Sequence, residues 1–187
     1  MRSQTWWYVA RAGGIVAWAL ASLTVVGGLQ LSTRLVRKPA PSWVLDVHRF
    51  LGGLTVAFVG VHMVGLAADQ FIGFGPAELL IPLASSYKPA AVALGVIAMY
   101  LLLAIEITSL AMRKMPRRTW HAVHLTSFIL FVVATVHGIT AGTDRHNAVF
   151  QWACLLTAAL VLMMTLVRIW SPRRAARASA SAASNRS

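Results

Sequence analysis

The sequence predicts an all-α integral membrane protein, a bundle of five transmembrane helices with the N-terminus outside the cell and the C-terminus inside. The composition supports this fold class, because 58% of the 187 residues are hydrophobic and only 12% are charged, against about 25% in a soluble domain. The charges are also clustered, which leaves apolar runs close to the roughly 20 residues that a helix needs to cross a bilayer. These charge-free runs cover residues 12–33, 50–68, 89–105, 119–143 and 146–167.

The distribution of basic residues predicts the orientation. Thirteen of the 17 Lys and Arg residues lie in three groups, within residues 34–49, 113–118 and 168–186, and the connections on the other side carry only four. The side with the excess is cytoplasmic by the positive-inside rule. We therefore interpret the net charge of +12 as an orientation signal and expect contact with membrane lipid but no nucleic-acid binding.

The first segment of the chain, residues 1–11, is predicted to be interfacial. Its Trp6, Trp7 and Tyr8 are typical of an aromatic anchor at the membrane surface. The membrane domain is predicted to cover residues 12–170. The first apolar run is too long for the core of a signal peptide, so we interpret it as a true span.

Two segments are predicted to lie outside the bilayer on opposite sides. Residues 71–89 predict a short amphipathic helix at the outer surface, starting near Pro76. Residues 171–187 are rich in Ala, Ser and Arg and predict a disordered basic cytoplasmic tail. The single cysteine, Cys154, excludes a disulfide framework and a cysteine metal cluster.

Four histidines lie within the predicted spans, where a polar ring is costly. His48 and His62 are fourteen residues apart on the second span, and His124 and His137 are thirteen apart on the fourth. Both spans run outward, so His48 should lie level with His124 near the inner side, and His62 level with His137 near the outer side. Two imidazoles on opposite sides of a flat ring are the axial ligands of a low-spin haem iron. The pattern therefore predicts bis-histidine haem sites at two levels.

The phase of the fourth span does not fit a straight helix. Fourteen residues bring His62 back to within about 40° of the direction of His48, whereas thirteen residues turn His137 about 140° away from His124. We expect either haems on different flanks of this helix or a local distortion between the two histidines. Taking His121 in place of His124 does not improve the alignment with His137. We expect His121 to be interfacial, with a spare ligand or a proton acceptor as the alternatives.

Other residues on these spans have two possible roles each. Gly52, Gly53 and Gly60 lie between His48 and His62 and give either clearance for a porphyrin or close helix packing. Glu106 lies level with the inner histidines and either accepts a hydrogen bond from a ligand imidazole or pairs with Arg49 or Arg113. Arg49 could instead meet a haem propionate, with Lys38 as a competitor.

The stretches LDVHRFLG, FVGVHM, WHAVHLTSF and TVHG, which carry the four histidines, resemble the ferric reductase-like transmembrane domain. That family includes NADPH oxidases, iron reductases and the haem subunits of bacterial methionine sulfoxide repair. The resemblance implies that His48 and His124 hold an inner haem b, and that His62 and His137 hold an outer one. Some bacterial relatives use fewer haems, so one haem is the alternative to two.

The resemblance also implies a function, a b-type cytochrome of the plasma membrane that carries electrons from a cytoplasmic-side donor to an outer acceptor. The larger members append a flavin and nicotinamide domain, which this sequence does not contain, so we expect an oxidoreductase component with a separate donor, a flavoprotein reductase or a quinol. The acceptor and the oligomeric state stay open. The rivals are a haem-binding sensor or accessory subunit, and a histidine-lined ion or proton transporter.

Overall fold

The computed structural model describes residues 4–33 and 42–184, with side chains as far as Trp170. Within these ranges every regular element is helical. The helices are α1 (Thr5–Thr33), α2 (Ser42–Ala68), α3 (Pro76–Leu80), α4 (Pro89–Leu110), α5 (Arg117–Leu125), α6 (Ser127–Ala141) and α7 (Ala148–Ser184), with two 3₁₀ turns, η1 (Met112–Lys114) and η2 (Thr143–His146). Five segments of the described chain are long and apolar enough to span a membrane, which confirms the predicted class.

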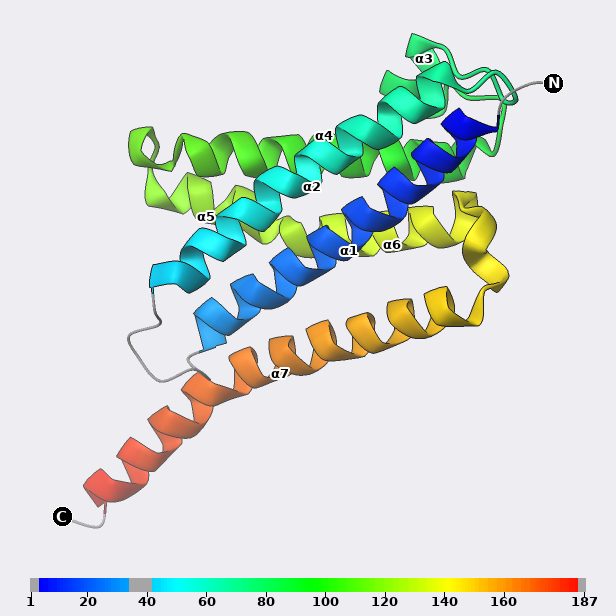
Figure 1. The fold of residues 1–187 in the computed structure, drawn as a ribbon. Coiled ribbons are helices and arrows are strands. Elements are labelled where there is room, and N and C mark those ends of the chain that lie inside the picture. Colours follow the sequence, from blue (N-terminus) through cyan, green and yellow to red (C-terminus); the bar gives the residue numbers. More distant parts are fainter. Residues whose placement is uncertain (1–3, 34–41, 185–187) are drawn as a thin grey trace.

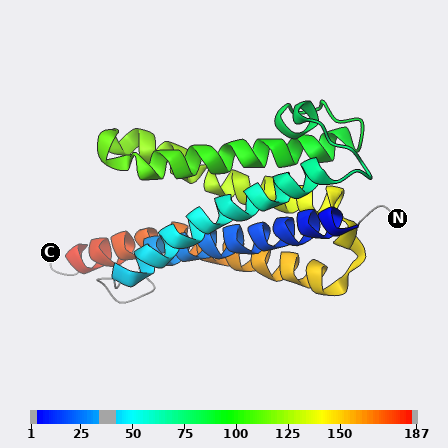
Figure 2. The ribbon, with the colours of Figure 1, turned by 45° about the horizontal axis from the view of Figure 1, so that its top comes forward.

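The bundle is built from helix pairs (Figure 1). α1 packs mainly on α2, α4 packs mainly on α6, and α7 lies against α1. Turning the view keeps α1 between α2 and α7 (Figure 2). In contrast, α2 and α6 do not pack closely against each other. α2 carries two of the four predicted ligands and α6 carries one. The backbones of these two helices therefore stay apart at the level of the histidines.

The ends of the bundle are defined here by the short helices that lie there. The α3 end holds the start of α1, α3 and η2, and the α5 end holds η1 and the start of α5 (Figure 1). The predicted short helix beside Pro76 forms as α3, with Pro76 in its first turn, where a missing N–H costs nothing. Which end faces the cytoplasm stays a prediction.

The fourth span is interrupted at Thr126. The Thr126 N–H bonds to the carbonyl of Val123 at 3.0 Å, as in a tight 3₁₀-type turn, and its hydroxyl donates to the same carbonyl at 2.6 Å. The span is thus divided into α5 with His124 and α6 with His137. Because the two histidines lie on separate helical segments, the rotation of a straight helix no longer relates their directions. A local distortion is one of the two alternatives that the thirteen-residue spacing left open.

Two apolar clusters fill the bundle between the levels of the histidines. Val25, Leu29, Phe131, Val161 and Met164 join α1, α6 and α7. On the other flank of α6, a second cluster joins it to α4, and its buried members are Ala98, Leu102, Ile105 and Leu130. These buried side chains form the apolar core of the bundle. Close packing of such side chains helps to hold helices together inside a lipid bilayer.

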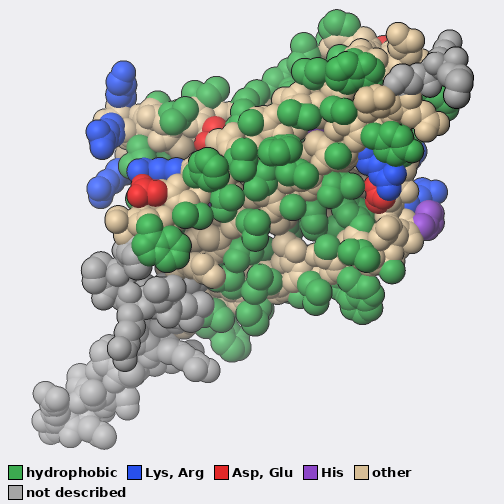
Figure 3. Space-filling model, viewed as in Figure 1, with side chains coloured by type: hydrophobic (Ala, Val, Ile, Leu, Met, Phe, Trp, Pro, Cys, Tyr) green, Lys and Arg blue, Asp and Glu red, His purple; other side chains and the backbone are tan. Residues whose placement is uncertain are grey.

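The surface has the pattern of a membrane protein (Figure 3). On the face shown, hydrophobic side chains cover the middle of the bundle, while Lys and Arg gather towards its two ends. Large apolar side chains such as Phe50, Val132 and Leu162 are more than half exposed. An apolar surface this extensive is suited to lipid contact rather than to water.

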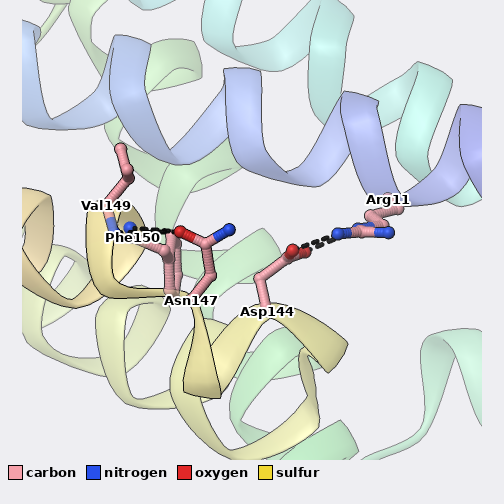
Figure 4. A network of polar contacts seen from close by, with 5 residues as sticks. All are labelled: Arg11, Asp144, Asn147, Val149 and Phe150. Atoms are coloured by element: carbon pink, nitrogen blue, oxygen red, sulfur yellow. Dashed lines mark hydrogen bonds and ion pairs between the residues drawn. The ribbon is translucent and has the colours of Figure 1, made fainter.

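An ion pair links α1 to η2 at the α3 end of the bundle. Arg11 of α1 donates from Nε to Oδ2 of Asp144 in η2 at 2.6 Å, and Nη2 meets the other carboxylate oxygen (Figure 4). The guanidinium also lies 5.1 Å from the ring centre of Trp7. Next to this pair, Oδ1 of Asn147 accepts the Val149 N–H at 2.9 Å and so caps the start of α7.

The two chain ends differ from the sequence predictions. α1 begins at Thr5, seven residues before the predicted run, because Arg11 has a counter-charge in Asp144 and the helix can therefore include it. α7 continues to Ser184, so residues 171–184 are helical where the sequence predicted disorder. The alanines and arginines there are strong helix formers, which explains the difference. Lys38 and residues 185–187 lie outside the described residues.

Replacing Asp144 with Asn should lower the free energy of unfolding. The change leaves Arg11 without its counter-charge, and the expected loss is about 1–3 kcal/mol. Thermal unfolding of the detergent-solubilised protein, followed by helical circular dichroism, measures it. Arg145→Ala is the matched control in the same turn, because the Arg145 side chain is exposed and, among the described residues, hydrogen-bonds only its neighbour His146. Equal effects of the two changes would contradict the role of the ion pair.

Candidate functional site

The structure brings the four histidines together in two pairs. The ring centres of His48 (α2) and His124 (α5) are 6.1 Å apart with an interplanar angle of 63°. The ring centres of His62 (α2) and His137 (α6) are 6.4 Å apart with an angle of 81°. These are the pairs expected from the sequence. The first lies towards the α5 end and the second towards the α3 end, about 20 Å apart along α2 at 1.5 Å per residue.

The two histidines at the α3 end are held by backbone carbonyls. Nδ1 of His62 lies 2.7 Å from the carbonyl oxygen of Ala10, and Nδ1 of His137 lies 2.7 Å from that of Ala91. A carbonyl only accepts, so Nδ1 must be the protonated nitrogen in both rings. Each neutral ring then carries its lone pair on Nε2, which is the nitrogen left for a metal.

The pair at the α5 end has a different environment. Nδ1 of His48 and Nδ1 of His124 are buried and have no hydrogen-bond partner among the residues that the structure describes. Trp120 stacks on His124, with ring centres 4.9 Å apart and an interplanar angle of 23°. His121 is exposed and meets the edge of Trp120 at 4.7 Å, so the structure pairs it with Trp120 rather than with His48.

Glycines of the neighbouring helices make room for the histidine rings. A Cβ at Gly14 of α1 would lie 3.0 Å from Nδ1 of His62, and one at Gly28 would lie 3.2 Å from Cε1 of His48. On α4, a Cβ at Gly95 would lie 2.5 Å from the ring of His137. The role of these three glycines was not predicted from the sequence. The signal was present, since Gly14 and Gly28 repeat the fourteen-residue spacing of His48 and His62 on an antiparallel neighbour.

The glycines predicted from α2 have unequal roles. A Cβ at Gly53 or Gly60 would meet nothing within 4 Å, so open space lies beside both. Gly52 is buried, and a Cβ there would collide with the carboxylate of Glu106. Gly52 therefore serves the packing of α2 against α4, whereas the clearance role of Gly53 and Gly60 stays a prediction.

Glu106 and Arg49 do not pair in the structure. Glu106 is half-buried on α4, with its carboxylate against Gly52, and within the described part of the chain it forms neither an ion pair nor a hydrogen bond. Arg49 follows His48 but is exposed. Neither of the two contacts proposed for Glu106 from the sequence is present.

A cavity of about 260 Å³ lies at the level of the second pair. It is bounded by α1, α2, α4 and α6, and both His62 and His137 line it. Most of the remaining lining is apolar, including Trp18, Met99 and Phe150. The Trp18 indole donates to the hydroxyl of Thr135 at 3.0 Å, which fixes one wall. Arg11 and Asp144 border the same cavity.

The spacing of each histidine pair fits a metal ion held between two imidazoles. A transition-metal ion lies about 2 Å from a ligating imidazole nitrogen, so opposed ligands place their nitrogens about 4 Å apart and their ring centres about 6 Å apart. The measured 6.1 and 6.4 Å agree with this value. No cluster of three or more His, Cys, Asp or Glu side chains occurs among the described residues, so a closed metal cage has no candidate there. The donor set fits a planar macrocycle with two axial sites.

Replacing Glu106 with Gln should leave the free energy of unfolding unchanged within about 0.5 kcal/mol, or raise it. The reason is that the carboxylate is partly desolvated and has no counter-charge to lose. Thermal unfolding measures the effect. Asp144→Asn is the matched control, because the same change of carboxylate to amide there breaks an ion pair. A loss at Glu106 as large as that at Asp144 would show that Glu106 has a polar partner after all.

Comparison with known families gives one match. Residues 13–135, about two thirds of the chain, match the ferric reductase-like transmembrane component family, and the matched range includes His48, His62 and His124 but ends before His137. The searches of curated proteins and of solved structures found no match. The extent of the family match confirms the resemblance recognised in the sequence: the chain belongs to the ferric reductase-like transmembrane component family.

Proposed function

We propose that this protein is a transmembrane b-type cytochrome that carries electrons across the plasma membrane between two haems. In this proposal His48 and His124 ligate one haem, and His62 and His137 ligate the other. The family membership supports a transmembrane redox component, and domains of this family generally bind haem. Three assignments go beyond the family match and are what we propose. They are the haem ligands, the number of haems and the direction of electron transfer.

The pairing of the imidazoles is the observation that carries the proposal. Two rings from different helices face each other at each of two levels, with the separation that one metal ion between them requires. The backbones of α2 and α6 do not pack closely against each other, and both histidines of the second pair line a cavity. A pair of histidines kept only for packing would have no reason to adopt this separation twice.

The chain's residues would do three things for electron transfer. The imidazoles hold the iron, while the Ala10 and Ala91 carbonyls orient two of these rings. The apolar clusters around Phe131 and Leu102 keep water out of the region between the two levels. When bound, haem iron supplies the one-electron redox chemistry, and the low-dielectric interior limits the charge rearrangement that accompanies each electron.

The charge distribution supports the proposed orientation of the chain, and the direction of electron transfer rests on our proposal that the donor lies on the cytoplasmic side. Arg113, Lys114, Arg117 and Arg118 lie at the α5 end, which the positive-inside rule assigns to the cytoplasm. Electrons would then enter near His48 and His124 and leave near His62 and His137. We propose a separate donor on the cytoplasmic side, a flavoprotein reductase or a quinol. Arg49, exposed beside His48, is the candidate to meet a haem propionate there.

Haem content per chain tests the proposal. Protein purified in detergent should show the reduced-minus-oxidised spectrum of a b-type cytochrome and contain two haems by pyridine haemochrome. His48→Ala and His124→Ala should each reduce the content to one haem, and so should the double variant, because both ligands serve one iron. His62→Ala and His137→Ala should remove the other haem in the same way.

Two exposed histidines are the controls for this series. His121→Ala and His146→Ala should keep both haems, since neither side chain faces another histidine across the bundle. A colourless wild-type protein, or a double variant His48→Ala/His124→Ala that loses more haem than either single variant, would contradict the proposed pairing.

A further inference from the structure

The same local arrangement holds both histidines at the α3 end. His62 donates to the carbonyl of Ala10 on α1, and Gly14 lies four residues later. His137 donates to the carbonyl of Ala91 on α4, and Gly95 again lies four residues later. Two helices that are unrelated in sequence position therefore present the same pair of features to two imidazoles.

The spacing of four residues has a physical reason. In an α-helix the carbonyl of residue i bonds the N–H of residue i+4, so the oxygen of Ala10 lies directly below Gly14, and that of Ala91 below Gly95. A side chain at position i+4 would stand between an approaching ring and that oxygen. A Cβ at Gly14 would lie 3.0 Å from Nδ1 of His62, and one at Gly95 would lie 2.8 Å from Nδ1 of His137.

The pair at the α5 end lacks the complete arrangement. Thr24 and Gly28 face His48 with the same spacing, and the Thr24 backbone lies close enough to act on the ring, but within the described chain Nδ1 of His48 reaches no hydrogen bond of normal geometry. For His124 no glycine contact is present, and Trp120 stacks on the ring instead. The two pairs thus differ in whether the imidazoles are held in one tautomer before anything binds.

We propose that Ala10 with Gly14 and Ala91 with Gly95 are positioning residues that hold His62 and His137 as Nδ1–H tautomers, with Nε2 free as the ligand atom. The inference rests on the proposed function for its consequence, since the tautomer matters only to a ligated metal. A hydrogen bond from Nδ1 to a carbonyl increases electron donation by Nε2. That donation stabilises the oxidised iron and lowers the reduction potential of the second centre.

The tautomer is measurable without haem. In the full chain, labelled with ¹⁵N-histidine and reconstituted haem-free in lipid nanodiscs, the ring nitrogens give different NMR shifts for the two tautomers. We expect two of the six histidines to be locked as Nδ1–H. His62→Gln and His137→Gln should each remove one of these signals and so assign them. Nε2–H tautomers at both positions would overturn the inference.

Alanine substitutions test the role of the glycines. Gly14→Ala should move the His62 signal towards a mixture of tautomers and leave His137 unchanged, and Gly95→Ala should do the reverse. Alanine is the better helix former, so a weaker helix cannot explain the effect. Gly27→Ala is the matched control on α1, because its Cβ would lie 3.8 Å from Nδ1 of His48, an ordinary contact.

The loaded protein gives a second readout. Gly14→Ala should raise the reduction potential of one of the two centres and leave the other unchanged, whereas Gly27→Ala should change neither. An unchanged His62 tautomer in Gly14→Ala, or equal shifts in Gly14→Ala and Gly27→Ala, would overturn the inference. If the wild-type protein is colourless but the tautomers are locked, the proposed function fails and the positioning role stands. If the Gly95→Ala protein does not accumulate, the test rests on the tautomers of the wild-type histidines and on the His62 tautomer in Gly14→Ala.

Discussion

The structure depends on one constraint, that a buried imidazole has two ring nitrogens and each needs a partner when water is excluded. In His62 and His137 the backbone of a neighbouring helix accepts from Nδ1, so the second nitrogen is left for something else. The ring centres of these two histidines lie 6.4 Å apart, and those of His48 and His124 lie 6.1 Å apart. In the proposed function a metal ion between the rings would bind the second nitrogen of His62 and of His137, which gives these two polar side chains a reason to lie inside an apolar bundle.

The sequence was sufficient for the levels and partners of the histidines. Five apolar runs set the direction of every span, and direction alone places His48 level with His124. The rotation along the fourth span was not predictable from spacing, because the interruption at Thr126 depends on a local hydrogen-bond choice. The role of Glu106 was also undecided from the sequence. Both contacts that its charge suggested are absent, and its carboxylate packs against Gly52 instead.

α1 contributes more to the site than its sequence suggested, because it carries no histidine. It packs closely along α2 and supplies the carbonyl of Ala10 and the space at Gly14 and Gly28. Its first turns are tied to the far side of the bundle through Arg11 and Asp144, and Trp18 reaches Thr135 on α6. α1 carries no predicted ligand, but it determines where the histidines of α2 can lie. This role depends on the packing of α1 against α2, which the sequence does not show.

In the proposed function one metal ion lies between two imidazoles at each level. Low-temperature electron paramagnetic resonance of the oxidised protein tests it most directly, because the signal of ferric haem reports both axial ligands and the angle between their planes. The interplanar angles of 63° and 81° predict low-spin signals of the strongly anisotropic type that steeply crossed imidazole planes produce. High-spin signals from the intact wild-type protein would mean fewer than two imidazoles on the iron and would contradict the account.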